Sequence, residues 1–406
     1  MGDLRLAWRN IWRNKRRTLL TAASIFLAVF LALLVRSLQT GMFDNLIKIS
    51  IESYTGHIQV HKRGYWDDKT IDNSMVYNDS LVYAVSRLKN VKTTVPRLEY
   101  FALASSGMQT KGVMVIGTEP LNEDSLTRLS SKMVKGSYLD RTSRGVIVAR
   151  GLAEFLGLHT GDTLILIGQG FHGVSAAGKF PVRGILHLPS PPLDNQMVYM
   201  NLPTAQDFFG ADNRITSLSI SLKNPDEIGM TMSELKSEIN PEKLEVMPWD
   251  ELMVEIMQQL KVKTASGLII ISILYMIVGF GIFGTVIMMT NERTKEFGVM
   301  VSVGMQRTRL AKILFLEMVF IGLTGALSGV AAAFPIMAWY NLHPIRLWGG
   351  MAQAYIAYGI EPLMPLALNW SSILTNVAAI LIIVMFTCIF PVRRAFRFKV
   401  VEALHK

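Results

Sequence analysis

The run Gly267–Met289 constrains this chain more than any other feature, because it contains no charged residue and is long enough to cross a bilayer. Three further runs have the same character, and only one is interrupted by a charge, at Glu317. Each is long enough for a membrane-spanning helix, which needs about 17–25 apolar residues. The sequence therefore predicts four transmembrane helices, with the other three in Thr18–Val35, Ile313–Tyr340 and Ile373–Ile389.

The first apolar run could be an uncleaved anchor or a cleaved signal peptide. A signal peptide has a shorter apolar core followed by small residues, whereas Thr18–Val35 ends in Val-Arg-Ser-Leu-Gln. An uncleaved anchor is therefore favoured. Apolar residues continue at roughly helical spacing through Ser37–Ser53, which predicts that this helix extends beyond the bilayer as a stalk.

A long segment separates the first two spans and has the pattern of a mixed α+β domain. Gly, Asp and Pro punctuate short β-type runs. The expected organisation is residues 1–53 as N-terminus, first helix and stalk, 54–263 as the inserted domain, and 264–406 as helices two to four with the C-terminal tail. The strands are expected at Val113–Ile116, Val146–Val148, Leu164–Ile167, Pro181–Ile185 and Leu218–Leu222, and helices at Gly151–Leu158, Asp226–Ile239 and Asp250–Lys263, the last running into the second span.

The net charge of +10 is unevenly distributed. Residues 36–266 hold 24 Lys and Arg against 25 Asp and Glu, so the excess lies beside the apolar runs, which argues against nucleic-acid binding. Basic residues crowd the N-terminus, the loop between spans two and three, and the C-terminal tail, whereas the loop between spans three and four has only Arg346. Short basic flanks stay in the cytoplasm. Both termini are therefore expected in the cytoplasm, and the inserted domain in the periplasm of a two-membrane bacterium.

Several patterns resemble catalytic or cofactor sites without their context. Gly173–Lys179 resembles a P-loop, but Phe180 follows where Ser or Thr should bind magnesium. Gly279, Gly281 and Gly284 match a dinucleotide pattern inside a membrane span, where glycines more often let helices approach closely. His57 and His61 could share a face and bind a metal, although a strand without metal is the favoured interpretation. We expect no catalytic, cofactor or metal site in this chain, and therefore no enzyme.

Glu317 is the one acidic residue within a predicted span. A carboxylate there is costly and normally faces protein or water. It is either a coupling or assembly contact or a surface residue that reaches the membrane boundary, and the sequence leaves both open. Gly322, Gly325 and Gly329 follow it, and the spacing of the last two suits tight helix packing.

Three separated segments resemble the MacB/FtsX-type (type VII) ABC transporter permeases. They are the basic, tryptophan-containing start of the first helix, the segment after the second helix with its ER…E-F-G pattern, and the closing motif; Glu317 and the glycines after it are similar too. The inserted domain is more loosely similar to the lipoprotein-releasing LolC/LolE branch. The three segments are Leu4–Thr18, Asn291–Gly304 and Pro391–Leu404, and the LolC/LolE-like stretches are Gly145–Asp162, Phe180–Ile185, Asp194 and Met197–Met200.

The resemblance implies a mechanism. In such permeases two membrane subunits pair, a separate cytoplasmic ATPase dimer binds ATP and magnesium, and its closure pushes a short cytoplasmic helix that moves the periplasmic domains. That coupling segment corresponds here to residues 291–304. The residues implied in coupling are Glu292, Arg293, Glu296, Gly298 and Gly304.

Three functions are compatible with these observations. The first is a permease that extracts lipoproteins from the inner membrane and passes them to a periplasmic carrier. The second is an export or mechanotransmission permease of the same superfamily. The third, a membrane-anchored sensor, is disfavoured because the sequence shows no cytoplasmic effector domain.

Overall fold

The computed structural model describes residues 2–13, 15–357 and 362–396. Glu361 lies outside the described residues. The C-terminal tail from residue 397, which includes the end of the closing motif, also lies outside them. Contacts divide the chain into two compact units, one of Met1–Asn45, Gln259–Arg346 and Leu363–Lys406, the other of Leu46–Gln258 and Leu347–Pro362. Each unit is described by itself.

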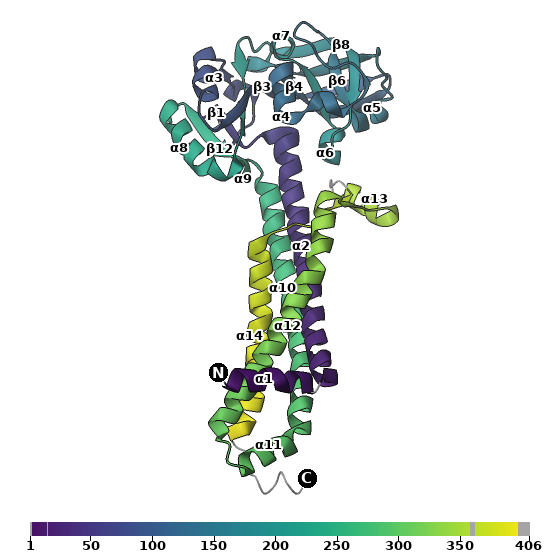
Figure 1. Ribbon diagram of the computed structural model, residues 1–406. Helices are drawn as coiled ribbons and strands as arrows, with labels where there is room; N and C mark the ends of the chain where they lie inside the picture. The colour runs from purple at the N-terminus through teal and green to yellow at the C-terminus, as the bar shows by residue number, and fades with distance from the viewer. Residues whose placement is uncertain (1, 14, 358–361, 397–406) are drawn as a thin grey trace. The chain divides into compact units, whose positions relative to one another are not determined.

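The first unit is a helical bundle with four helices long and apolar enough to span a membrane, as the sequence predicts. Its core contains Ile25, Val29, Ile282, Ile321 and Ile380, which four different helices contribute. Figure 1 shows α1 crossing α12, and α11 connecting α10 to α12. The helices are α1 (Gly2–Arg13), α2 (Lys15–Ser50), α10 (Val254–Glu292), α11 (Thr294–Ser302), α12 (Arg307–Leu342) and α14 (Trp370–Phe396).

The connection between the third and fourth spans contains more structure than its Gly and Pro residues suggest. A short antiparallel pair, β13 (Ile345–Arg346) and β14 (Leu363–Met364), encloses α13 (Gly349–Ala357). β13 and β14 belong to the helical unit, whereas α13 belongs to the other unit.

Gly279, Gly281 and Gly284 of the second span differ in what faces them. A Cβ on Gly281 or Gly284 would meet nothing within 4 Å, and one on Gly279 would lie 3.4 Å from Ile383. Within the described part of this chain, therefore, Gly279 meets a neighbouring helix and Gly281 and Gly284 do not, so close packing at these two glycines stays a prediction.

The second unit is an α+β domain built on a ten-stranded sheet of order β12-β1-β11-β3-β4-β9-β6-β8-β5, in which β7 pairs with β3 and β8. All pairs are antiparallel except β4 with β9 and β6 with β8. The strands are β1 (Ile58–Lys62), β3 (Val91–Ser106), β4 (Gln109–Thr118), β5 (Met133–Gly136), β6 (Val146–Ala149), β7 (Thr163–Gln169), β8 (Ser175–Leu186), β9 (Met197–Asn201), β11 (Ser217–Leu222) and β12 (Leu244–Pro248), with a separate pair β2 (Met75–Val76) and β10 (Arg214–Ile215).

Both faces of this sheet are covered, because side chains alternate between two cores. On β6, Val146 and Val148 join one core, whereas Ile147 and Ala149 join the other. All five expected strands are confirmed. The covering helices are α3 (Asp79–Ser86), α4 (Pro120–Thr127), α5 (Arg150–Leu156), α6 (Pro191–Asp194), α7 (Leu202–Phe209) and α8 (Ile228–Glu238), with 3-10 turns at Ile71–Asn73, Leu129–Lys132, Phe171–Gly173 and Pro225–Glu227.

The two helical connections into this domain differ from each other. The helix α2 continues past Ser50 as a π-helical turn, η1 (Ile51–Thr55). It ends at Gly56, whose φ of +71° favours glycine. The helix expected over Asp250–Lys263 is interrupted. A short α9 (Trp249–Leu252) ends at Met253, where φ is −110° and ψ is 48°, before α10 begins. The prediction of one continuous helix over Asp250–Lys263 is therefore wrong.

Candidate functional site

The segment 291–304 forms a helical turn-back between the second and third spans. After α10, α11 packs Phe297 against Leu310 and Leu314 of α12. Gly298 is buried on the same helix. The chain then reverses at Gly304, whose φ of +101° suits only glycine, and α12 begins. This geometry fixes α11 to the end of the third span.

A buried ion pair joins this segment to the interior of α12. The Arg293 Nη1 lies 2.5 Å from Glu317 Oε2, and the two side chains are only 3% and 2% exposed. Burial alone would lower the pKa of Arg293, but the carboxylates of Glu317 and Glu296 raise it above its ordinary value. Glu317 is thus not a surface residue reaching for the membrane boundary; it contacts an arginine of this chain.

The N-terminal helix contributes two further partners to this cluster. Asn10 Nδ2 donates to Glu317 Oε1 at 2.7 Å, and Arg13 Nη2 lies 2.8 Å from Glu296 Oε2. Arg293 Nε also reaches Glu296, at 3.3 Å. We call Asn10, Arg13, Arg293, Glu296 and Glu317 the coupling cluster. The cluster joins α11 to both α1 and α12, through the buried Arg293–Glu317 pair and the more exposed Arg13–Glu296 pair.

Glu292 precedes the coupling cluster and is exposed at the end of α10. Nearby, Arg394 of α14 donates to the Asn291 side chain, and Arg307 donates to the Phe396 carbonyl at 3.2 Å. Three of the bundle's four long helices therefore meet around this segment.

The glycines of α12 lie where neighbouring helices pack tightly against it. A Cβ on Gly325 would lie 2.8 Å from the Ala22 carbonyl oxygen, and one on Gly329 would lie 2.9 Å from that of Phe26. Both therefore face α2 at a separation that leaves no room for a side chain. Gly322 instead faces α14, where a Cβ would lie 3.2 Å from Val384 Cγ1.

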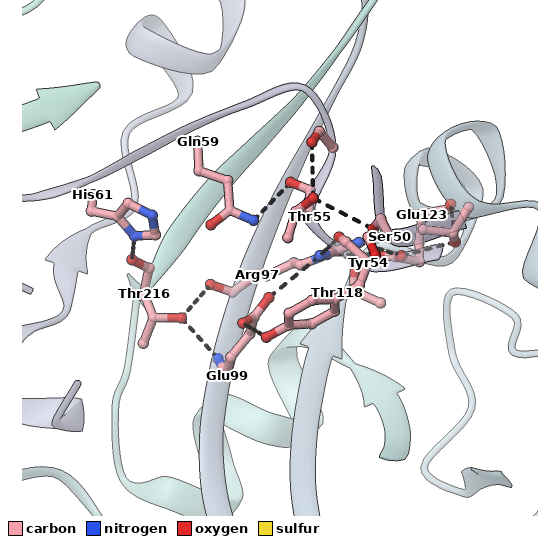
Figure 2. Close-up of polar contacts among 12 residues, drawn as sticks. Ser50, Tyr54, Thr55, Gln59, His61, Arg97, Glu99, Thr118, Glu123 and Thr216 are labelled. Atoms are coloured by element: carbon pink, nitrogen blue, oxygen red, sulfur yellow. Dashed lines mark hydrogen bonds and ion pairs between the residues drawn. The ribbon is translucent and has the colours of Figure 1, made fainter. Parts of the chain in front are cut away.

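A second buried charge network holds η1, the turn that ends the first membrane-spanning helix, within the inserted domain (Figure 2). Arg97 on β3 is fully buried. Its Nη2 and Nε bind the two oxygens of Glu123 on α4 at 2.6 and 2.8 Å, and Nη1 donates to the Tyr54 carbonyl at 2.5 Å. Tyr54 OH in turn donates to Glu99 at 2.6 Å. This arrangement clamps η1 to the sheet.

The alternation of β3 places this network. Leu98 points into one core, so Arg97 and Glu99 point to the opposite face, where η1 and α4 lie. Thr118 and Thr127 each donate to Glu123 at 2.9 Å. Burial would lower the pKa of Arg97, but Glu123 and Glu99 raise it well above its ordinary value. The guanidinium therefore stays charged, with its hydrogen bonds made.

His57 and His61 do not form a metal site in the described residues, where no group of three or more His, Cys, Asp or Glu could hold an ion. His61 lies on β1, is buried, and contacts the Thr216 carbonyl through Nδ1 at 3.1 Å. Burial lowers its pKa to about 4. The Gly173–Lys179 stretch leaves a 3-10 turn (Phe171–Gly173) and enters strand β8, and is not a loop entering a helix.

Two models of protein families match nearly the whole chain. The MacB-like periplasmic core domain matches residues 18–238, and the FtsX-like permease C-terminal matches residues 268–400. This chain belongs to the MacB/FtsX family of ABC transporter permeases. It is a multi-pass membrane protein whose MacB-like periplasmic domain is inserted between its first and second spans.

Several curated relatives of this permease cover most of its length at low identity. The lipoprotein-releasing system transmembrane protein LolC of Neisseria meningitidis is 22% identical over 330 residues, 79% of this chain and 77% of that protein. LolE of Haemophilus influenzae is 21% identical and covers 98% of each chain. The macrolide export ATP-binding/permease protein MacB of Agrobacterium fabrum is 22% identical over 84% of this chain, which spans 53% of that protein.

Solved structures also match the inserted domain of this permease. The periplasmic region of MacB from Actinobacillus actinomycetemcomitans is 15% identical, with a TM-score of 0.36, and covers 53% of this chain and 98% of that one. The extracellular domain of the transporter YknZ from Gram-positive bacteria is 16% identical, with a TM-score of 0.35, and covers 47% and 100%.

The sequence pointed to Glu317 separately from the segment that holds Arg293 and Glu296, and the structure brings the three residues together. Sequence reasoning missed Asn10 and Arg13, although the spacing of Ala7, Asn10 and Ile11 is that of one helix face. It also missed Arg97 and its carboxylates, which are far apart in sequence and carry no local signal.

Proposed function

We propose that this permease couples ATP hydrolysis by a separate cytoplasmic ATPase dimer to movement of its periplasmic domain. The observation that supports this most is the buried Arg293–Glu317 pair, which joins α11 to a membrane span. In this proposal ATP and magnesium bind to the partner ATPase, and this chain binds no cofactor itself. A second permease subunit, either another copy or a homologue, completes the complex.

The proposal places the protein in a bacterial inner membrane with both termini in the cytoplasm. The basic flanks support this orientation, since α11 and its neighbours carry Lys295, Arg307 and Arg309. The two charge clusters then lie on opposite sides of the bilayer. α2 runs from near the coupling cluster into the turn that Arg97 binds, so a helix carries motion without a pore.

For the substrate, we propose lipoproteins extracted from the inner membrane for a periplasmic carrier. The similarity to the lipoprotein-releasing system proteins LolC and LolE, nearly full-length for LolE, supports this choice. The alternative is export of another substrate, or transmission of a signal, because MacB of Agrobacterium fabrum matches at the same identity as LolC.

Depletion of this permease tests the substrate. We expect lipoproteins destined for other membranes to accumulate in the inner membrane, measured by quantitative proteomics of separated membranes. Depletion of an unrelated inner-membrane permease is the control. Unchanged inner-membrane lipoproteins, with the ATPase partner still bound, would favour the export function.

Replacing Glu292 and Glu296 with Ala tests the docking of the ATPase. We expect ATPase recovered per permease in mild detergent to fall about tenfold, which corresponds to about 1.4 kcal/mol of binding free energy. The reason is that both carboxylates belong to the segment proposed to meet the ATPase, and Glu296 also orients Arg13 and Arg293.

The matched control for this experiment is Glu234→Ala with Glu238→Ala. These two exposed carboxylates lie four residues apart on α8 of the inserted domain. The control should recover as much ATPase as the unaltered chain. Equal recovery from both double variants would remove the docking role of the segment.

A further inference from the structure

The N-terminal helix α1 is held near the membrane surface by its contacts with the third span. α1 ends at Arg13, and the first membrane span begins at Thr18. Its Asn10 contacts Glu317, and the ring of Trp8 lies 5.6 Å from that of Phe320, both on the third span. α1 therefore runs where α12 enters the apolar region and cannot lie far from the lipid headgroups.

α1 has three distinct faces. Ala7 is fully buried against the bundle, and Asn10 and Ile11 share that face. The adjacent face carries Leu4, Trp8 and Trp12, which are exposed by 51%, 44% and 56% although all are large and apolar. Because Phe320 lies about one helical turn further along α12 than Glu317, contact with Trp8 directs this apolar face toward the hydrocarbon.

The third face of α1 is cationic and uncompensated. Arg5 and Arg9 are four residues apart, so they share one side of the helix, next to the apolar face. Both are exposed, and no ion pair found in the described part of the chain involves either. The single acidic residue of α1, Asp3, instead binds Arg309 at 2.9 Å and Lys312 at 3.7 Å.

An apolar face rich in Trp beside an Arg face is the pattern of a helix lying in a bilayer interface, with its cations at the headgroup phosphates. We propose that Arg5 and Arg9 form a binding site for anionic phospholipid headgroups, with Leu4, Trp8 and Trp12 in the acyl-chain region. Charge complementarity selects the occupant, because an anionic leaflet attracts each arginine near its surface. The inference rests on the cytoplasmic placement of the N-terminus in the proposed function.

This site adjoins the coupling cluster. The same short helix that presents Arg5 and Arg9 to lipid donates Asn10 to Glu317 and Arg13 to Glu296. A bound headgroup therefore fixes the helix that holds the Arg293–Glu317 pair in place. The lipid acts as a structural ligand of the coupling cluster.

Native mass spectrometry of the full chain tests the lipid site. The chain is released from mixed micelles containing equal amounts of phosphatidylglycerol and phosphatidylcholine, and the ratio of the two bound lipids is measured. We expect Arg5→Gln with Arg9→Gln to lower the phosphatidylglycerol preference by about fivefold for each arginine removed. Arg5→Lys with Arg9→Lys keeps the charge and should retain most of the preference, and excess inorganic phosphate should not displace the lipid.

The control is Lys261→Gln with Lys263→Gln, which removes two exposed cations from α10 at the start of the second span. An unchanged lipid ratio in the Arg5 and Arg9 double variant, or an equal loss in the control, would overturn the proposal. Displacement by inorganic phosphate would also overturn it, by showing a general anion site. The assay contains neither ATPase nor transported substrate, so its failure is distinguishable from failure of the proposed function.

Discussion

Replacing Arg97 with Ala should lower the free energy of unfolding of the periplasmic domain by about 3–5 kcal/mol, because it leaves two buried carboxylates without their cation. Glu123 is fully buried and would lose both of its bonds to the guanidinium, at 2.6 and 2.8 Å. The Tyr54 carbonyl of η1 would lose its donor as well. For a domain of this size the loss corresponds to a fall in Tm of about 10 °C.

This loss is measured by thermal unfolding of the full chain in detergent, with proteolysis of the periplasmic domain as the readout. Arg150→Ala is the matched control, because Arg150 pairs with Glu154 at 3.7 Å on the surface and both side chains are well exposed. That exposed pair should contribute at most about 1 kcal/mol. Joint replacement by Arg97→Met and Glu123→Leu should recover part of the stability, since Glu123 is then removed together with its cation and only Glu99 loses its arginine. Equal Tm shifts for Arg97→Ala and Arg150→Ala would contradict this account of the network.

The second large effect is expected at Glu317. Glu317→Ala leaves Arg293 buried beside the membrane span without its closest carboxylate and removes the acceptor of Asn10. We expect lipid-stimulated ATP hydrolysis by the reconstituted complex to fall at least about tenfold, equivalent to about 1.4 kcal/mol in the activation free energy. The ATPase should remain bound, because the exposed part of α11 is unaltered.

Two comparisons separate charge from packing at this position. Glu317→Gln keeps the size and an acceptor for Asn10 but removes the charge, so it should fall between Glu317→Ala and the unaltered chain. Leu327→Ala, on an exposed part of the same helix, should leave hydrolysis unchanged. If Glu317→Ala behaves like Leu327→Ala, the buried pair does not couple α11 to the membrane span.

Much of this fold is predictable because its signals are local. In a bilayer, the backbone N–H and C=O groups of an apolar run such as Gly267–Met289 must form hydrogen bonds within the run. Such a run therefore predicts a helix without knowledge of its neighbours. The β-type runs at Val146–Val148 and Leu218–Leu222 alternate or are bounded by turns, and both are strands. The break at Met253 was not predictable, because nothing at that residue disfavours a helix.

The candidate sites depend on contacts between distant residues. Glu317 was a candidate functional residue in the sequence because a carboxylate is costly in a membrane span. Its partners could not be predicted, because they lie 24 and 307 positions away. Arg97 and Glu123 resemble ordinary surface residues in the sequence, since only the fold buries them. Gly281 and Gly284 meet no helix of the described chain, because spacing shows which side of a helix a residue occupies but not what faces it.

The central claim is that a separate ATPase docks at α11, and a single crosslinking measurement tests it. In a Cys388→Ser background, Val299→Cys places a thiol on α11 at a position that is 51% exposed, and Met108→Cys places one on the fully exposed β3–β4 turn of the periplasmic domain. A short thiol-to-amine reagent is applied to native membranes, and the crosslinked peptides are identified by mass spectrometry. The account predicts crosslinks from position 299, and not from position 108, to a protein that hydrolyses ATP. Crosslinks to such a protein from position 108 only, or from neither position, would contradict it.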